Sequence, residues 1–217
     1  MIRVPHVAIV DYGMGNLYSV KRACEFVGIS AEITSDKDVV AAAAGIILPG
    51  VGAFGNAMAT LQQHDLISPM KEAIVSGKPF LGICLGMQLL MSESEEFGAH
   101  KGLDIFKGNV VQFPHVNGTG ERIKVPQVGW NTIAQGRAWS EAPLDGVLPG
   151  SYMYFVHSFR VIPLQEDIVA TTSVYEDISY CSGIAKDNVT AFQFHPEKSG
   201  TKGIQIYKNF ARIIGAR

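Results

Sequence analysis

The first hundred residues alternate between short apolar runs and segments whose apolar residues recur at helical spacing. Four of the runs have the composition of buried strands, namely HVAIVDYG, SAEITSD, IILPGVGAFG and PFLGI. A helical segment follows each run, so consecutive strands cannot pair as simple hairpins and are expected to run parallel. The pattern therefore predicts an α/β fold, with a mixed, largely parallel open sheet and helices on both of its faces.

Four helices are expected between and after these strands. Their ranges are 16–28, 36–45, 56–77 and 85–96, and Asn16 is a candidate N-terminal cap for the first of them. We expect the third helix to form two pieces with a break near Pro69, because proline lacks the N–H group that a helix interior needs.

The pattern changes at about Phe106, where strand-like segments follow one another with few helical segments between them. These segments are FKGNVVQF, SYMYFVHSF, DIVATTSVY and NVTAFQFH, and the tail TKGIQIYKNFARII is helical again. Neither a flexible linker nor an internal repeat separates the two halves. We therefore expect a single domain over residues 1–217, in which the second half adds strands to the same sheet.

Charge and cysteine content argue against several classes of protein. The formal net charge of −2 disfavours a general binder of nucleic acid or of an anionic membrane. Three cysteines without close spacing disfavour a disulfide framework or a CxxC metal site, and we expect neither a metal nor a cofactor. The longest apolar run is broken by Gly45 and Pro49 and is too short to cross a bilayer. Because the N-terminus lacks the features of a signal peptide, we expect a soluble, cytoplasmic protein.

The stretch KPFLGICLGMQLL places Cys84 between Gly82 and Gly86, where the predicted strand becomes a helix. Gly-x-Cys-x-Gly in this context has the form of a nucleophile elbow, a sharp turn that needs small neighbours on both sides. Such a turn exposes the sulfur above the strand ends, and the helix N-terminus favours its thiolate. The Leu85 N–H is then a candidate donor to an oxyanion. The alternative is an inert, buried cysteine in a tight crossover.

A thiol nucleophile needs a base, and the base needs a group that orients it. His195 follows the strand-like run VTAFQF, and Pro196 biases it towards an extended backbone. Because residues i and i+2 of an extended segment point to the same side, we expect Glu197 to lie beside the His195 ring. Taken alone, His195 is more often a structural histidine at a strand end. Together with the cysteine elbow, it favours a triad of Cys84, His195 and Glu197.

The stretches GICLGMQLL and FHPEKS resemble the class I (triad) glutamine amidotransferases, and the resemblance covers essentially the whole chain. It implies the flavodoxin-like α/β fold of that family. The stretches DYGMGN, LPGVGAFG, PQVGWN and YFVHSF resemble one branch of it, the glutaminase subunits of imidazole glycerol phosphate synthase.

This resemblance implies a reaction, in which L-glutamine is hydrolysed to glutamate and ammonia through a γ-glutamyl thioester on Cys84. His195 would carry the protons and Glu197 would orient it. The matching motifs further imply an oxyanion hole and a glutamine pocket, the first from Gly50, Val51, Gly52 and Leu85 and the second from Gln88, His157 and Ser158. Without the resemblance, Gln88 is equally a solvated helix residue and His157 a strand histidine with a satisfied hydrogen bond.

Little of the chain remains for a domain that uses ammonia, so we expect the ammonia to pass to another chain. The resemblance implies that this partner is the cyclase subunit, a (β/α)8 barrel that forms a heterodimer with the glutaminase. It would make imidazole glycerol phosphate and aminoimidazole carboxamide ribotide in histidine biosynthesis. Trp130 and Tyr154 are candidate docking anchors, because aromatic residues often carry interface energy; the alternative is that both belong to the core.

Other functions remain open at this level. A paralogous subunit would carry the same triad and serve another acceptor, such as an amidino sugar of a surface polysaccharide. A stand-alone cysteine hydrolase of the same fold, either a peptidase or a γ-glutamyl hydrolase, would act without a partner. A non-catalytic subunit is disfavoured because the triad is intact. DYGMGN is interpreted as a helix-start turn, since the full G-x-G-x-x-G dinucleotide motif is missing.

Overall fold

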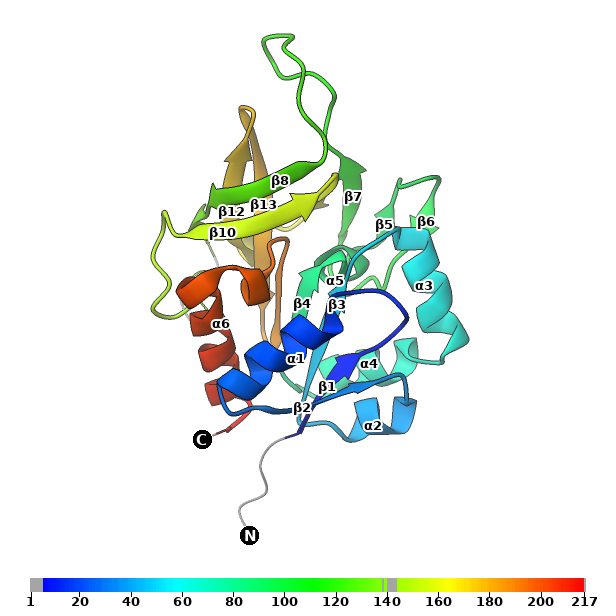
Figure 1. The fold of residues 1–217 in the computed structure, drawn as a ribbon. Helices are drawn as coiled ribbons and strands as arrows, with labels where there is room; N and C mark the ends of the chain where they lie inside the picture. Colours follow the sequence, from blue (N-terminus) through cyan, green and yellow to red (C-terminus); the bar gives the residue numbers. More distant parts are fainter. Residues whose placement is uncertain (1–5, 138, 140–143, 217) are drawn as a thin grey trace.

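The structure is a computed structural model, which describes residues 6–137, 139 and 144–216. Its main sheet runs through the middle of the molecule, with helices on both sides (Figure 1). One half of this sheet consists of five strands, β1 (His6–Val10), β2 (Ser30–Thr34), β3 (Gly45–Gly50), β4 (Phe80–Cys84) and β14 (Val189–Phe192). They lie in the order β2-β1-β3-β4-β14, and every neighbouring pair is parallel. The predicted largely parallel α/β sheet is confirmed.

The other half of the main sheet comes from the second half of the chain. Its strands are β5 (Glu93–Ser94), β6 (His100–Lys101), β7 (Gly108–Gln112), β9 (Ala134–Gln135), β11 (Phe159–Pro163), β12 (Val169–Tyr175) and β13 (Ile178–Lys186). The order continues from β14 as β13-β11-β7-β5-β6, while β12 and β9 extend from β13. These pairs are antiparallel except for β5 with β7.

Two further strands do not join the main sheet. β8 (Gln127–Thr132) and β10 (Tyr152–His157) form a separate antiparallel pair, which crosses in front of β12 and β13 in Figure 1. The expectation that the whole second half extends one sheet was wrong for this pair. Met153 and Phe155 are fully buried in the same apolar cluster as Phe192 and Phe194, so β10 packs on a face of the main sheet instead of along its edge.

Within the described residues, six α-helices and two short 3₁₀ turns cover the sheet. They are α1 (Leu17–Phe26), α2 (Lys37–Ala42), α3 (Phe54–Gln63), α4 (Ile67–Val75), α5 (Leu85–Leu89), α6 (Gly200–Ile213), η1 (Glu166–Ile168) and η2 (Pro196–Lys198). Side chains alternate along β1: Val7 and Ile9 pack with α1 and α6, whereas Ala8 and Val10 pack with α2, α3 and α4. Helices therefore cover both faces, as the sequence predicted.

Two details of the predicted helices were wrong, and a third was confirmed only in part. The break in the third helix lies around Asp65, whose φ is +53°, while Pro69 sits in the first turn of α4, where a missing N–H costs no hydrogen bond. The fourth helix ends at Leu89, because the chain beyond it turns back to pair as β5 with β6 and β7. Asn16 occupies the N-cap position of α1, but its side chain makes no capping hydrogen bond.

The parallel strands bring the predicted site residues to one edge of the sheet. Gly50 and Cys84 are paired at the carboxyl ends of β3 and β4, and β14, the next strand, leads into His195. Ligands of open α/β sheets bind at this edge. Among the helices of the described residues, none is long and apolar enough to cross a membrane.

Candidate active site

Cys84 ends β4 and is the N-cap residue of α5, with φ 55° and ψ −109°. An L-residue with a side chain rarely adopts this backbone, which is characteristic of the sharp turn that the sequence predicted. The neighbouring glycines are sterically required. A Cβ atom at Gly86 would collide with the Leu48 carbonyl oxygen, and one at Gly82 would lie 2.8 Å from the Cβ of Ala191.

His195 lies three residues beyond β14 and has the extended backbone that was expected, with φ −101° and ψ 96°. Its Nδ1 lies 2.8 Å from Oε1 of Glu197, and both side chains are almost completely buried. The expected contact is therefore present, but the reason given for it was wrong. Glu197 belongs to the 3₁₀ turn η2, so the turn, and not an extended i, i+2 pair, brings its carboxylate back to the ring.

The electrostatic surroundings of His195 favour the charged ring. Burial lowers the pKa of His195, but the neighbouring Cys84 and Glu197 side chains outweigh it and raise the pKa to about 10. The Nε2 atom is buried and makes no well-aligned hydrogen bond within the described chain, but the Cys84 sulfur favours the protonated ring, first as a hydrogen-bond acceptor and then as a negative charge. The surroundings of His195 therefore favour an imidazolium at neutral pH.

The Cys84 sulfur also receives a hydrogen bond from a side chain that the sequence analysis missed. Gln193 is fully buried, and its Nε2 donates to the sulfur at 3.7 Å. Its Oε1 accepts from Nε2 of Gln88 at 3.1 Å, and Gln88 also donates to the Phe159 carbonyl at 3.1 Å. Gln88 is buried, so the interpretation as a solvated helix residue was wrong. The available signal for Gln193 was an amide within the otherwise apolar run AFQF.

A cavity of about 280 Å³ opens beside Cys84. This volume suits a ligand of the size of an amino acid. Among the predicted site residues, those that line it are Val51, Gly52, Cys84, Leu85, Gln88, His157 and Ser158. Gly50, His195 and Glu197 are not part of the lining.

His157 presents a neutral ring to this cavity. Burial lowers the pKa of His157 to about 4, against the opposing effect of a hydrogen bond to the Phe159 carbonyl. Nδ1 lies 2.8 Å from that carbonyl, which can only accept, so Nδ1 carries the proton. The Nε2 atom is buried and has no partner in the described chain, which leaves it as an acceptor. The alternative of a strand histidine with a satisfied hydrogen bond is confirmed for Nδ1, and Nε2 remains available for a ligand.

Glu96 is a second site residue that the sequence analysis missed. It lines the cavity, and its Oε2 accepts a hydrogen bond from the Phe54 N–H at 2.6 Å. Among the described lining residues it is the only carboxylate, so it can pair with a cationic group of a ligand. Glu96 was missed because it lies in the acidic run SESEE, which we interpreted as the end of a helix.

The predicted oxyanion segment (residues 50–52) crosses the edge of the cavity. Gly52 has a φ of +104°, which favours glycine, and Val51 is 40% exposed. The N–H groups of both residues make no backbone hydrogen bond within the described chain, and Leu85 is the first residue of α5, where helix N–H groups are unpaired. Among the described residues, no cluster of three or more His, Cys, Asp or Glu side chains could hold a metal.

Comparison with known proteins identifies the class. The family described as glutamine amidotransferase class-I matches residues 8–214. Two solved structures share the fold, PurLQS from Thermotoga maritima and the glutaminase domain of Trypanosoma brucei CTPS with bound acivicin. The first has a TM-score of 0.71 and 19% identity, with 98% of this chain and 100% of that chain covered. The second has a TM-score of 0.68 and 16% identity, with 97% and 94% covered. The fold and the match define a class I glutamine amidotransferase.

Sequence comparison with curated relatives identifies the branch of this family. The imidazole glycerol phosphate synthase subunit HisH of Geobacter metallireducens is 48% identical over 206 residues, which cover 94% of this chain and 97% of the relative. The HisH subunit of Aquifex aeolicus is 46% identical over 208 residues, with 94% and 95% covered. The chain belongs to this HisH family of glutamine amidotransferases.

Proposed function

We propose that the chain is the glutaminase subunit of an imidazole glycerol phosphate synthase. It hydrolyses L-glutamine and passes the ammonia to a cyclase subunit of the same complex. The observation that carries this proposal is the assembly of Cys84, His195 and Glu197 beside a cavity of amino-acid size, in a chain whose relatives are HisH subunits. The whole chain would act as one domain in the cytoplasm.

In the first step, the Cys84 thiolate attacks the side-chain amide carbon of glutamine. A C–S bond forms, and the electrons of the C=O bond move to the oxygen. Backbone N–H groups of residues 50–52 and of Leu85 stabilise this oxyanion. The His195 imidazolium then donates its proton to the amide nitrogen, the C–N bond breaks, and ammonia leaves behind a γ-glutamyl thioester.

In the second step, the neutral His195 takes a proton from water as the water oxygen attacks the thioester carbon. The C–S bond breaks, glutamate is released, and Cys84 returns to the thiolate beside a charged His195. Glu197 holds the Nδ1 side of the ring through both steps, so that Nε2 remains directed to the reaction.

The remaining lining residues recognise the amino-acid part of glutamine. Glu96 supplies the negative charge that a substrate α-ammonium group needs, and the free Nε2 of His157 supplies an acceptor. Ser158 also lines the cavity. Gln88 donates hydrogen bonds to the Phe159 carbonyl and to Gln193, and so holds in place the amide that contacts the Cys84 sulfur.

The pair β8–β10 is the proposed docking face for the cyclase, a (β/α)8 barrel. Trp130 is 56% exposed, so the interpretation as a core residue was wrong for this side chain. Its ring meets that of the half-buried Tyr154 edge-on, with centroids 6.0 Å apart. The Tyr154 carbonyl accepts the His195 N–H at 2.9 Å, which connects the docking face directly to the triad.

The experiment that tests the function measures glutamate release from glutamine by the purified chain. It is run on the chain alone, then with a cyclase subunit and the nucleotide ligand of the cyclase. We expect low activity alone and strong activation by the pair. High activity without a partner would identify a stand-alone hydrolase instead, and no response to the cyclase would contradict the proposed partner.

Replacement of the nucleophile separates its chemical role from a structural one. Cys84→Ala should abolish glutamine hydrolysis, while the complex should still make its product from added ammonia. Loss of both activities would mean that Cys84 supports the structure of the complex, and retention of glutamine hydrolysis would exclude Cys84 as the nucleophile.

A further inference from the structure

Tyr12 lies in the DYGMGN loop that follows β1, a stretch to which the proposed chemistry gives no role. The side chain is only 1% exposed, so its hydroxyl needs a partner inside the protein. Its Oη donates a hydrogen bond to the carbonyl oxygen of Pro49 at 2.8 Å. The loop thus places a buried hydroxyl donor, that of Tyr12, against the Pro49–Gly50 peptide unit at the end of β3.

That peptide unit leads directly into the proposed oxyanion segment. The Pro49 carbonyl belongs to the peptide bond between Pro49 and Gly50, the last two residues of β3. The proline ring already fixes φ at Pro49, and the hydrogen bond from Tyr12 restrains the plane that follows. The orientation of this plane sets the direction in which the chain continues to Val51 and Gly52.

The hydroxyl and Gly50 also fit together sterically. A Cβ atom at Gly50 would collide with the Tyr12 hydroxyl and would lie 3.0 Å from the Cβ of Leu85. Position 50 therefore needs glycine because of close packing, and not because of a positive φ. The segment is thus closely packed at Gly50, whereas Val51 is partly exposed.

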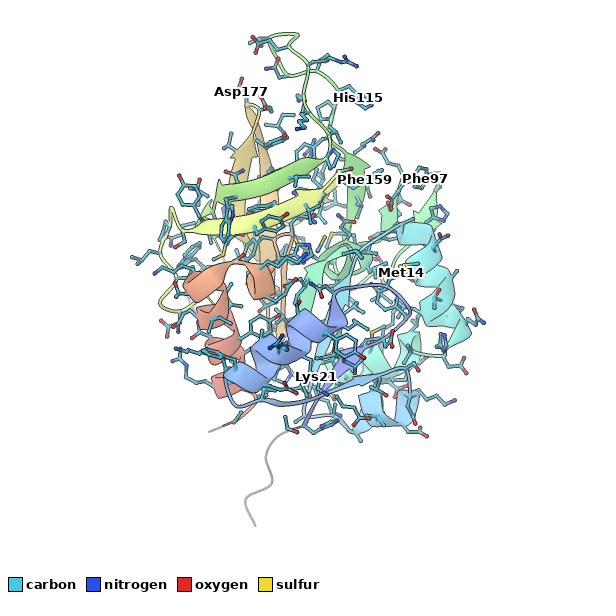
Figure 2. All side chains as sticks on the ribbon, viewed as in Figure 1. Met14, Lys21, Phe97, His115, Phe159 and Asp177 are labelled. Atoms are coloured by element: carbon cyan, nitrogen blue, oxygen red, sulfur yellow. The ribbon has the colours of Figure 1, made fainter. Side chains whose placement is uncertain are left out.

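Two observations place the Tyr12–Pro49 contact close to Cys84 and to the proposed oxyanion segment. Burial, and then the negative charge of Cys84, raise the pKa of the Tyr12 hydroxyl, so it remains a donor at every pH at which the protein functions. The same loop reaches the far end of the segment, because a Cβ atom at Gly52 would lie 3.5 Å from Sδ of Met14, which Figure 2 labels on this loop.

We propose that Tyr12 is a positioning residue of the oxyanion hole. Its hydroxyl fixes the Pro49–Gly50 peptide, so that the N–H groups that follow are aimed at the oxyanion formed on Cys84. This inference rests on the proposed role of residues 50–52. It assigns to Tyr12 an effect on the transition state, and not on glutamine binding or on the thiolate.

Tyr12→Phe tests the proposal, because it keeps the ring and removes only the hydroxyl. A misaligned oxyanion donor weakens transition-state stabilisation, so kcat for glutamine should fall about tenfold while KM stays within about twofold. Alkylation of Cys84 by iodoacetamide forms no oxyanion, and its rate should stay at the wild-type value. Both measurements use the full chain, alone and in complex with the cyclase subunit and its nucleotide ligand.

The matched control is Tyr175→Phe, which removes a hydroxyl that donates to the Lys124 carbonyl at the same distance of 2.8 Å. It should leave kcat of the chain alone within about twofold. Unchanged kcat in Tyr12→Phe would overturn the proposal, and so would a rise in KM alone. An equal loss in alkylation would also overturn it, since Tyr12 would then support Cys84 itself. Glutamate release by the wild type tests the proposed function separately.

A stability measurement tests the steric part independently. Gly50→Ala should lower the melting temperature more in the wild-type background than in the Tyr12→Phe background, because the added methyl group collides with the hydroxyl. Equal losses in the two backgrounds would show that the hydroxyl and Gly50 are not interlocked, and the proposed restraint would be withdrawn.

Discussion

At the scale of single residues, the sulfur of Cys84 lies between a charged ring and an amide donor. Sequence reasoning found His195 and Glu197 because His-Pro-Glu is a short and distinctive pattern. It missed Gln193 and Glu96 because neither side chain follows from local spacing. Gln193 acts on the sulfur through a contact between residues 109 positions apart, and Glu96 reaches the cavity only after the chain reverses direction.

Gln193→Glu should reduce the reactivity of Cys84. The substitution is nearly isosteric, but it replaces the N–H donor with a negative charge that disfavours the thiolate. We expect the rate of alkylation by iodoacetamide at neutral pH to fall about tenfold, together with glutaminase activity. Gln63→Glu, at an exposed position at the end of α3, is the control and should change neither rate. Normal alkylation in Gln193→Glu would exclude Gln193 as a partner of the thiolate.

The neutral His157 should make the protein sensitive to acid. Its pKa is about 4 in the folded chain, against an ordinary value of 6.5, so the unfolded chain binds a proton between these values and the folded chain does not. Stability therefore falls as the pH falls through this window, by about 2 kcal/mol between about pH 6.5 and pH 4.5.

Urea unfolding at these two pH values measures the contribution of His157. His157→Gln should lose about 2 kcal/mol less than the wild type on acidification. His64→Gln, at an exposed position, should behave as the wild type does. Equal acid sensitivity in all three proteins would mean that His157 is charged in the folded chain.

At the scale of elements, periodicity predicted the alternation of strands and helices well, because each segment buries a face of its own. The errors lie where partners distant in sequence decide the outcome. The run SESEE has a helical composition, yet β5 forms there because β6 and β7 offer it hydrogen bonds. The pair β8–β10 leaves the main sheet because the buried side chains of β10 cover a face of that sheet.

One element junction, at Ser199, joins β10 to the candidate triad. Oγ of Ser199 accepts from the Tyr154 N–H at 3.0 Å and donates to the His195 carbonyl at 2.6 Å. Ser199→Ala would remove both hydrogen bonds, which should cost about 1–3 kcal/mol of unfolding free energy. Ser76→Ala removes a single hydroxyl bond to the Ala73 carbonyl and should cost less. Urea unfolding of both variants compares the two losses of unfolding free energy. Equal losses in Ser199→Ala and Ser76→Ala would show that the Ser199 junction contributes no more stability than a single hydroxyl hydrogen bond.

At the scale of the whole molecule, the candidate triad and the proposed docking pair of Trp130 and Tyr154 are directly connected, because the Tyr154 carbonyl accepts the His195 N–H. The class of fold was predictable from the alternation alone, and the candidate triad from two short motifs. The separate β8–β10 sheet, which carries the proposed docking face, was not predictable, since strand composition does not determine which strand a given strand pairs with.

Trp130→Ala should weaken the complex with the cyclase. A large exposed aromatic side chain at the centre of an interface often contributes strongly, so we expect the dissociation constant to rise about tenfold or more by calorimetry. Leu164→Ala removes another exposed apolar side chain, on the turn after β11, and is the control. If both variants bind as the wild type does, the docking face lies elsewhere.

The backbone of Cys84 has a consequence for how this chain evolves. A φ of 55° with a ψ of −109° resembles the first central position of a type II′ turn. Glycine adopts this backbone conformation readily, whereas a cysteine in it is strained. Selection for turnover, and not for folding, therefore keeps cysteine at this position. In a gene copy that no longer needs to hydrolyse glutamine, replacement of Cys84 by glycine would not destabilise the fold. Descendants of that kind would keep the whole architecture and would have lost only the sulfur.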